Sequence, residues 1–216
     1  MAQFARPISD DATTITWTPS SGSTSYGCID EETASDVDYT TSQSNQTGYY
    51  ETGLSAVTDP ESSSDHVVRW RAVRTNTGKD MTVVMTLYDT SGSIATQTKT
   101  NTDLNSYTTF EYTLTSGEAD SISAYDDLSI RFNITVNGGG ANSLNLSWAE
   151  FEVPAGVTYA DGHSDIITQS SLISSAKNIK DAQTDIITQS DFSAIGAIGQ
   201  TLDGIANIVG ISDFSP

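Results

Sequence analysis

The sequence predicts a mainly β protein: an antiparallel β-sandwich of jelly-roll type over residues 1–155, followed by an extended or helical C-terminal segment over residues 156–216. Apolar and polar residues alternate with a period of two in several short runs of the first part. Serine and threonine together make up 60 of the 216 residues, which suits strands and turns better than helices. The length allows one domain with a proper core and an appendage.

The clearest predicted strand covers residues 127–136, where every second residue from Leu128 to Val136 is apolar and those between are polar. Four further strands are predicted over residues 66–74, 81–88, 107–115 and 143–153. In the last of them the alternation changes phase after Trp148, which predicts a β-bulge. Glycine-containing and Asx-containing turns separate these runs, and no helix is expected between them. This succession of short strands is typical of a sandwich.

The composition changes near Pro154, and the boundary between the two parts is placed there. Residues 1–155 carry 21 acidic and 7 basic side chains, whereas residues 156–216 carry 7 acidic and 2 basic ones. The second part also contains a repeat, because the six residues 165–170 recur unchanged as 185–190. Two copies are too few for a solenoid, so we expect a duplicated stalk or docking segment.

A heptad-like apolar stripe in the C-terminal segment is the predicted assembly surface. Its members are Phe192, Ile195, Ile198, Leu202, Ile205 and Val209. Glycines lie among them, and each costs about 1 kcal/mol relative to alanine in a helix, so the segment needs a partner surface to become helical. That surface could be the protein's own sandwich, the sister copies of a homotrimer, or a cavity in another protein.

The formal charge of −19 excludes two classes of partner. A strongly acidic chain repels phosphate groups and anionic lipid headgroups, so neither nucleic acid nor a membrane surface is an expected partner. No run of 18 apolar residues and no basic region followed by an apolar core is present, so we expect neither a membrane span nor a cleaved signal. The remaining partner classes are neutral molecules, cations and proteins.

No convergent set of catalytic residues is recognisable, so we expect a protein that is not an enzyme and carries no cofactor. The two histidines, His66 and His163, lie on opposite sides of the predicted boundary, and neither belongs to a metal-binding or nucleophile motif. A glycosidase needs two carboxylates across a cleft, and nothing selects two from the 28 present. The single Cys28 excludes an internal disulfide, and we expect it to be a small buried residue.

Two weaker alternatives concern ligands. Clustered carboxylates at 30–32, together with Asp36 and Asp38, could bind calcium, although the complete spacing of a calcium loop is absent. Aromatic residues could form a platform for a glycan, since planar rings can stack on sugars; the candidates are Trp17, Tyr26, Tyr39, Tyr49 and Tyr50. Among them Tyr49 and Tyr50 are the predicted glycan contacts. Most aromatic residues on strands belong to cores, which is the competing interpretation.

The sequence of the first 155 residues resembles the sequences of small virion proteins of tailed phages. The resemblance begins with Phe4-Ala5-Arg6-Pro7 and Trp17-Thr18-Pro19 and continues with Ile29-Asp30-Glu31 and Asp36-Val37-Asp38-Tyr39. Later segments that carry it are His66-Val67-Val68-Arg69-Trp70-Arg71-Ala72, Leu128-Ser129-Ile130-Arg131-Phe132 and Ser147-Trp148-Ala149-Glu150-Phe151-Glu152-Val153-Pro154. The resemblance implies a structural component of a virus particle and implies no catalytic residues. It does not extend into the C-terminal segment.

These observations lead to a functional prediction with one rival. The prediction is a non-enzymatic virion protein exposed on the particle, as a capsid decoration, head fibre or turret, anchored or trimerised by its C-terminal segment. Its partners would be itself and capsid or tail proteins. The rival is a carbohydrate-binding module, associated with a tail or baseplate or secreted, whose partner would be a host-surface glycan.

Overall fold

The computed structural model of the chain describes residues 2–137 and 141–156. They belong to the first of two compact units, which spans Met1–Thr158. The predicted assembly stripe from Phe192 to Val209, the internal repeat and His163 lie outside the described residues. Predictions about the C-terminal segment and its partners therefore stay predictions.

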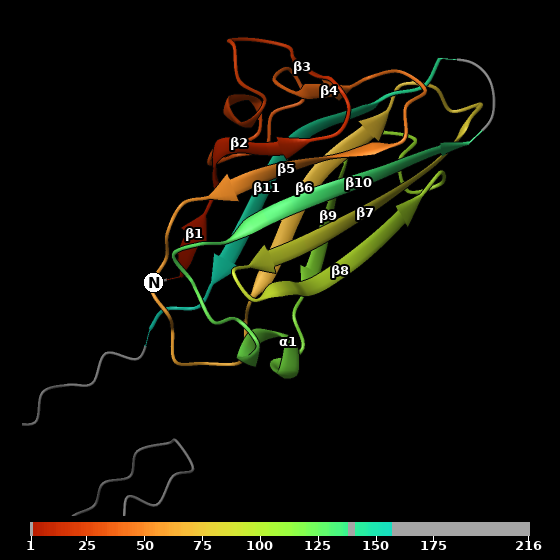
Figure 1. Cartoon of the computed structure of the whole chain (residues 1–216). Helices are drawn as coiled ribbons and strands as arrows, with labels where there is room; N and C mark the ends of the chain where they lie inside the picture. The colour runs from red at the N-terminus through yellow and green to blue at the C-terminus, as the bar shows by residue number, and fades with distance from the viewer. Residues whose placement is uncertain (1, 138–140, 157–216) are drawn as a thin grey trace, which may run out of the picture. The chain divides into compact units, whose positions relative to one another are not determined.

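The described residues form two antiparallel β-sheets that lie one over the other (Figure 1). The five-stranded sheet has the order β2 (Pro7–Thr13), β5 (Gly48–Leu54), β10 (Ser129–Asn137), β7 (Asp80–Asp89) and β8 (Gly92–Thr100). The six-stranded sheet has the order β3 (Trp17–Pro19), β4 (Thr40–Ser42), β11 (Leu144–Val153), β6 (Val67–Arg74) and β9 (Thr108–Thr113), with β1 (Gln3–Ala5) paired to β11. The predicted fold class, a mainly β antiparallel sandwich, is confirmed.

The five strands predicted from alternation all exist, with ends shifted by one or two residues. A bulge in this strand is confirmed, but it lies before Trp148 and not after it: the pairing of β11 with β6 shifts register between Leu146 and Trp148. Six further strands, β1 to β5 and β8, were not predicted individually. Most of them are short or rich in threonine and lack a clear apolar alternation.

The expectation that no helix interrupts the strands is wrong at one place. A five-residue helix, α1 (Ser116–Asp120), connects β9 to β10. Thr115 accepts a hydrogen bond from the backbone N–H of Glu118, and the Glu118 carboxylate accepts one from the backbone N–H of Thr115. This reciprocal capping box satisfies donors that a helix start leaves free, and its Thr-x-x-Glu pattern is readable in the sequence. A single turn of 3-10 helix, η1 (Tyr26–Cys28), precedes β4.

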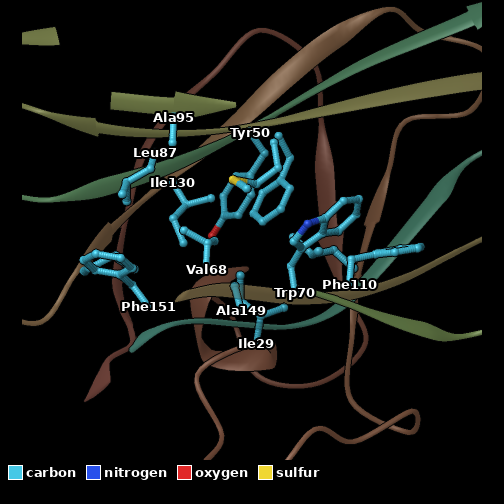
Figure 2. Close-up of a cluster of buried hydrophobic side chains, with 14 of the residues drawn as sticks. Ile29, Tyr50, Val68, Trp70, Leu87, Ala95, Phe110, Ile130, Ala149 and Phe151 are labelled. Atoms are coloured by element: carbon cyan, nitrogen blue, oxygen red, sulfur yellow. The ribbon is translucent and has the colours of Figure 1, made fainter. Parts of the chain in front are cut away.

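The core lies between the two sheets and is built from the inward-facing residues of both. Figure 2 shows Trp70 and Phe110 of the six-stranded sheet close together, and their ring centroids are 4.5 Å apart. The ring of Phe132, from the five-stranded sheet, lies 5.5 Å from that of Trp70. The indole N–H of Trp70 donates to the Gln97 side chain, which itself donates to the backbone oxygen of Glu111. Gln97 of β8 therefore links the two sheets at one side of the sandwich.

Within the described residues, no helix has the length and apolar character needed to cross a bilayer.

Candidate ligand-binding face

The outer face of the five-stranded sheet carries an unusual group of planar side chains. Inward-facing Ile130, Phe132 and Ile134 of β10 are buried, so Arg131 and Asn133 between them face outward. Tyr49 of β5 is paired with Asn133, and Tyr88 of β7 is paired with Ser129. The two tyrosines therefore flank Arg131 diagonally, one on each neighbouring strand.

Arg131 stacks on both tyrosine rings. Its guanidinium carbon lies 4.5 Å from the ring centroid of Tyr49 and 4.7 Å from that of Tyr88. Both distances are within the range of cation–π contacts, and a planar guanidinium is well suited to stacking. All three side chains are only partly buried. The result is an aromatic–guanidinium–aromatic row across three strands that solvent can reach, which we call the Tyr49–Arg131–Tyr88 row.

Glu51 neutralises the charge of this row. Its Oε2 accepts hydrogen bonds from Nε and Nη2 of Arg131 at 2.8 and 2.6 Å, and its Oε1 accepts one from the Ser129 hydroxyl at 2.8 Å. Burial disfavours the charged form of Arg131, but the hydrogen bonds and the charge of Glu51 outweigh it and raise the pKa of Arg131 above its ordinary value. The arginine is thus held in one orientation and carries a matched counter-charge.

Hydroxyl and amide groups surround the row on the same face. Asn133 and Thr135 of β10 are exposed, as are Thr96, Thr98 and Thr100 of the edge strand β8. Thr82 of β7 lies between these two groups, paired with Thr135 on one side and Thr100 on the other. The face combines two aromatic rings with uncharged hydrogen-bonding groups, which is the combination that fixes a polar organic ligand.

Of the two predicted glycan contacts, one is accessible to a ligand and the other is buried. Tyr49 lies on the outer face, where a ligand can reach it. Tyr50 is 1% exposed, so the prediction for Tyr50 is corrected: its ring belongs to the core and packs against Trp17 in a tilted arrangement, with centroids 5.2 Å apart. Consecutive residues of a strand point to opposite faces, and only one of the pair can face solvent here.

Tyr50 nevertheless has a role in organising the neighbouring loop. Its hydroxyl donates a 2.6 Å hydrogen bond to Asp10, and the same carboxylate accepts hydrogen bonds from the backbone N–H groups of Ser25 and Tyr26. Burial and the Asp10 carboxylate raise the pKa of Tyr50. Asp10 therefore fastens the start of η1 to β2 and β5. The sequence does not single out Asp10 for this role, because Asp10-Asp11 is one of several pairs of adjacent carboxylates that arise by chance in an acidic chain.

The other predicted aromatic candidates do not join the row. Trp17 is 9% exposed and packs in the core. Tyr26 lies in η1 and Tyr39 precedes β4, and both are partly buried. Arg131 and Tyr88 were not singled out from the sequence, although the alternation of 127–136 already placed Arg131 on the outward side.

Two of the predicted calcium ligands, Asp36 and Asp38, accept hydrogen bonds from neighbouring side chains. Asp36 accepts hydrogen bonds from Arg71 at 2.6 and 2.8 Å, which lowers the pKa of Asp36. Asp38 accepts hydrogen bonds from the hydroxyls of Ser20 and Ser21. Burial raises the pKa of Glu31. In the part of the chain that the structure describes, no group of three or more His, Cys, Asp or Glu side chains is arranged to hold a metal ion.

His66 and Cys28 are both buried. Cys28 is 0% exposed, as predicted. The Nδ1 of His66 lies 3.0 Å from the backbone oxygen of Ser64 and its Nε2 lies 2.8 Å from the Tyr125 hydroxyl. Because a carbonyl oxygen only accepts, Nδ1 carries the proton and Nε2 accepts from Tyr125 in the neutral ring. Burial lowers the pKa of His66, which favours that neutral form.

Comparison with known proteins gives only distant matches, all of them to solved structures. No protein-family model and no curated protein matches the chain. Among solved structures, a CBM4 chain matches with 14% identity and a TM-score of 0.35 over 51% of this chain and 66% of that chain. The family 11 carbohydrate-binding module of the cellulase Lic26A-Cel5E of Clostridium thermocellum matches with 10% identity and a TM-score of 0.32 over 74% of this chain and 89% of that chain.

A third match is the enzymatically active domain of tailspike protein 4 of bacteriophage CBA120, with 9% identity and a TM-score of 0.38. It covers 69% of this chain but only 19% of the tailspike chain.

The class that the structure itself defines is an antiparallel β-sandwich with a partly exposed aromatic row on the outer face of its five-stranded sheet.

Proposed function

We propose that the sandwich is a non-enzymatic carbohydrate-binding module whose ligand lies on the outer face of the five-stranded sheet. The observation that carries the proposal is the Tyr49–Arg131–Tyr88 row, held in place by Glu51. Sugar rings present C–H faces that pack on aromatic rings and hydroxyl groups that pair with fixed polar groups. The row and its surrounding Asn and Thr side chains supply both kinds of contact.

The electrostatics of the face favour a neutral ligand. Arg131 is already paired with Glu51, so it holds the two tyrosine rings in place without adding a net positive charge to the face. The whole chain carries a formal charge of −19, which repels uronic-acid or sialic-acid polymers at low ionic strength. A neutral polysaccharide avoids that repulsion and loses none of the stacking contacts.

Binding assays with alanine variants of the two tyrosines test this proposal. Purified full chain would be titrated with a panel of neutral polysaccharides, using affinity electrophoresis and calorimetry. We expect Tyr49→Ala and Tyr88→Ala each to weaken binding about tenfold, because each removes one stacking ring from the row. Tyr39→Ala is the matched control, since Tyr39 is a partly buried tyrosine outside the row.

Thermal unfolding of each variant would show that loss of binding is not loss of the fold. A wild-type chain that binds no member of a broad neutral panel would contradict the proposal, as would variants that bind as well as wild type. Release of new reducing ends from a bound polysaccharide would contradict the non-enzymatic part of it.

A place on a virus particle is the second candidate, and the specific observation behind it is the resemblance of residues 1–155 to small virion proteins. On this hypothesis the sandwich is displayed as a capsid decoration, head fibre or turret, or beside a tail or baseplate. The assembly stripe from Phe192 to Val209 would then join three copies or anchor the protein to capsid or tail proteins. The two candidates are compatible, because a displayed glycan-binding sandwich could attach a particle to a host surface.

A further inference from the structure

Edge strand β2, which pairs with the strand that carries Tyr49, has a β-bulge at Asp11 (Figure 1). Asp10 lies opposite Thr52 of β5 and Ala12 lies opposite the adjacent Glu51, so Asp11 between them is an extra residue with no opposing residue of its own. A bulge changes the direction in which a side chain points, and bulges are frequent beside functional sites. The contacts of β5 show where this bulge directs Asp11.

The Asp11 carboxylate lies over Gly53 on the outer face of the sheet. Thr52 of β5 is buried between Glu51 and Gly53, so position 53 has the same outward direction as Glu51. A Cβ atom at position 53 would lie 2.7 Å from Oδ2 of Asp11 and 2.5 Å from Oγ of Ser9, closer than Cβ atoms approach other atoms in proteins. The missing side chain of Gly53 therefore provides the space that the carboxylate occupies.

This position is at the Tyr88 end of the Tyr49–Arg131–Tyr88 row. Gly53 is paired with Ser129 of β10, and Ser129 is paired with Tyr88 of β7. Neighbouring strands lie about 4.8 Å apart, so two strand spacings separate Gly53 from Tyr88. Glycine and serine are small, so neither of the positions 53 and 129 places a large side chain between the carboxylate and the Tyr88 ring.

Asp11 also keeps the acceptor capacity that Glu51 has lost. Both oxygens of Glu51 already accept hydrogen bonds, from Arg131 and Ser129. Oδ1 of Asp11 accepts a hydrogen bond from the Ser9 hydroxyl at 2.5 Å, whereas Oδ2 has no hydrogen-bond donor among the residues that the structure describes. Asp11 is exposed, so a ligand can reach this oxygen. An ionised carboxylate has about four acceptor sites and can accept two donors side by side.

We propose that Asp11 determines which glycans the outer face binds, because its carboxylate accepts hydrogen bonds from two adjacent hydroxyl groups of a sugar ring that packs on Tyr88. Hydroxyl groups on neighbouring ring carbons present two donors side by side, which match the acceptors of a carboxylate. Such hydrogen bonds to an ionised acceptor are about twice as strong as those between neutral groups. The ligand class is therefore a neutral polysaccharide with unsubstituted adjacent hydroxyls. This inference rests on the proposed function and names the chemical group that is recognised.

Two variants that remove or displace the carboxylate test the role of Asp11 in the full chain. The probes are the member of the neutral panel that wild type binds most tightly and the same polymer after complete O-methylation, which removes its hydroxyl donors. We expect Asp11→Asn to weaken binding of the unsubstituted polymer about tenfold and to leave the weaker binding of the methylated polymer unchanged. Gly53→Ala should have the same effect, because its Cβ atom displaces the carboxylate without removing a polar group.

Asp120→Asn and Gly117→Ala are the matched controls. Asp120 is an exposed aspartate at the end of α1, and a Cβ atom on Gly117 would have no other atom within 4 Å. Both controls should bind like wild type, and thermal unfolding of all the variants would show that the fold is kept.

The ratio of the affinities for the two polymers separates a direct contact from a structural effect, because a variant with a distorted sheet loses affinity for both polymers. If Asp11→Asn and Gly53→Ala have the ratio of wild type while Tyr88→Ala still weakens binding, the role of Asp11 is overturned and the proposed function stands. A wild-type chain that binds no neutral polysaccharide would contradict the proposed function, and the role of Asp11 with it.

Discussion

At the scale of single residues, the pairing of Arg131 with Glu51 determines what the outer face can bind. An unpaired arginine between two tyrosines would attract anions, but the Glu51 carboxylate occupies two of its donors. Glu51 itself is only 14% exposed in its side chain, so solvent screens this pair less than a surface ion pair. If the outer face binds glycans as proposed, its preference for neutral over anionic ones depends on this one carboxylate.

We expect Glu51→Gln to shift this specificity. The substitution keeps the size of the side chain but removes the counter-charge of Arg131, so a uronic-acid polymer should bind more tightly to the variant than to wild type. The affinity for neutral glycans should fall, because the amide no longer holds the guanidinium in place. Affinity electrophoresis with one neutral and one anionic polymer measures both effects.

Glu111→Gln is the control for this prediction, since Glu111 is an exposed partner of Arg69 on the other sheet. Equal ratios of anionic to neutral binding in wild type and Glu51→Gln would show that Glu51 does not set the charge preference of the face.

At the scale of elements, carboxylates fasten loops to the strands beside them. Asp89, at the end of β7, is 8% exposed and accepts hydrogen bonds from Ser91 and Gly92 in the β7–β8 turn through Oδ1. Its Oδ2 accepts from the backbone N–H and hydroxyl of Ser123, which follows α1. One side chain thus connects a hairpin turn to the segment that leads into β10. Asp10 likewise connects η1 to β2 and β5.

We expect acid to weaken the sandwich partly through Asp89. Burial opposes ionisation, but the hydrogen bonds from Ser91 and Ser123 outweigh it and lower the pKa of Asp89 to about 2. The ordinary pKa is about 3.9, so the ionised form contributes about 2 kcal/mol to the free energy of unfolding above pH 4. That contribution is lost as the pH falls from about 4 to 2.

Denaturant unfolding of Asp89→Asn between pH 2 and 7 measures this contribution. The variant should be less stable than wild type at pH 7, and the difference should shrink toward pH 2. Asp127→Asn, which changes an exposed aspartate, should follow the wild-type curve. A difference that stays constant over the whole pH range would mean that the charge of Asp89 is not what stabilises the turn.

The strands themselves illustrate what can be predicted from local pattern. The alternation over 127–136 identified β10 and its outward Arg131, and the phase change near Trp148 identified the bulge in β11. By contrast, β5 has the burial pattern of a strand that is covered on both faces at its end, so no simple alternation marks it. Without β5 as a strand, Tyr49 and Tyr50 could not be assigned to opposite faces.

At the scale of the whole molecule, the virion hypothesis places association in the C-terminal segment. It requires a three-fold or anchoring step that resides in residues 156–216. Charge opposes association through the sandwich, since residues 1–155 carry 21 acidic against 7 basic side chains and the sandwiches of two copies repel each other.

We expect a chain that ends at Ala155 to lose any three-fold stoichiometry of the full chain and to sediment as a monomer, because it lacks the apolar stripe. Sedimentation equilibrium of both chains at low and high salt measures the two stoichiometries. A three-fold species that survives truncation would contradict the assignment of assembly to the stripe from Phe192 to Val209.

The sequence by itself determined the class of fold, five of the strands and the bulge, because side-chain alternation is a local property of a strand. Its net charge also predicts that nucleic acid is not a partner. Only the tertiary structure decided which residues meet across strands: Tyr49, Arg131 and Tyr88 come from β5, β10 and β7, and their register is set by long-range pairing. The burial of Tyr50 was decided in the same way, because the face of β5 that is covered depends on the sheet that packs over it.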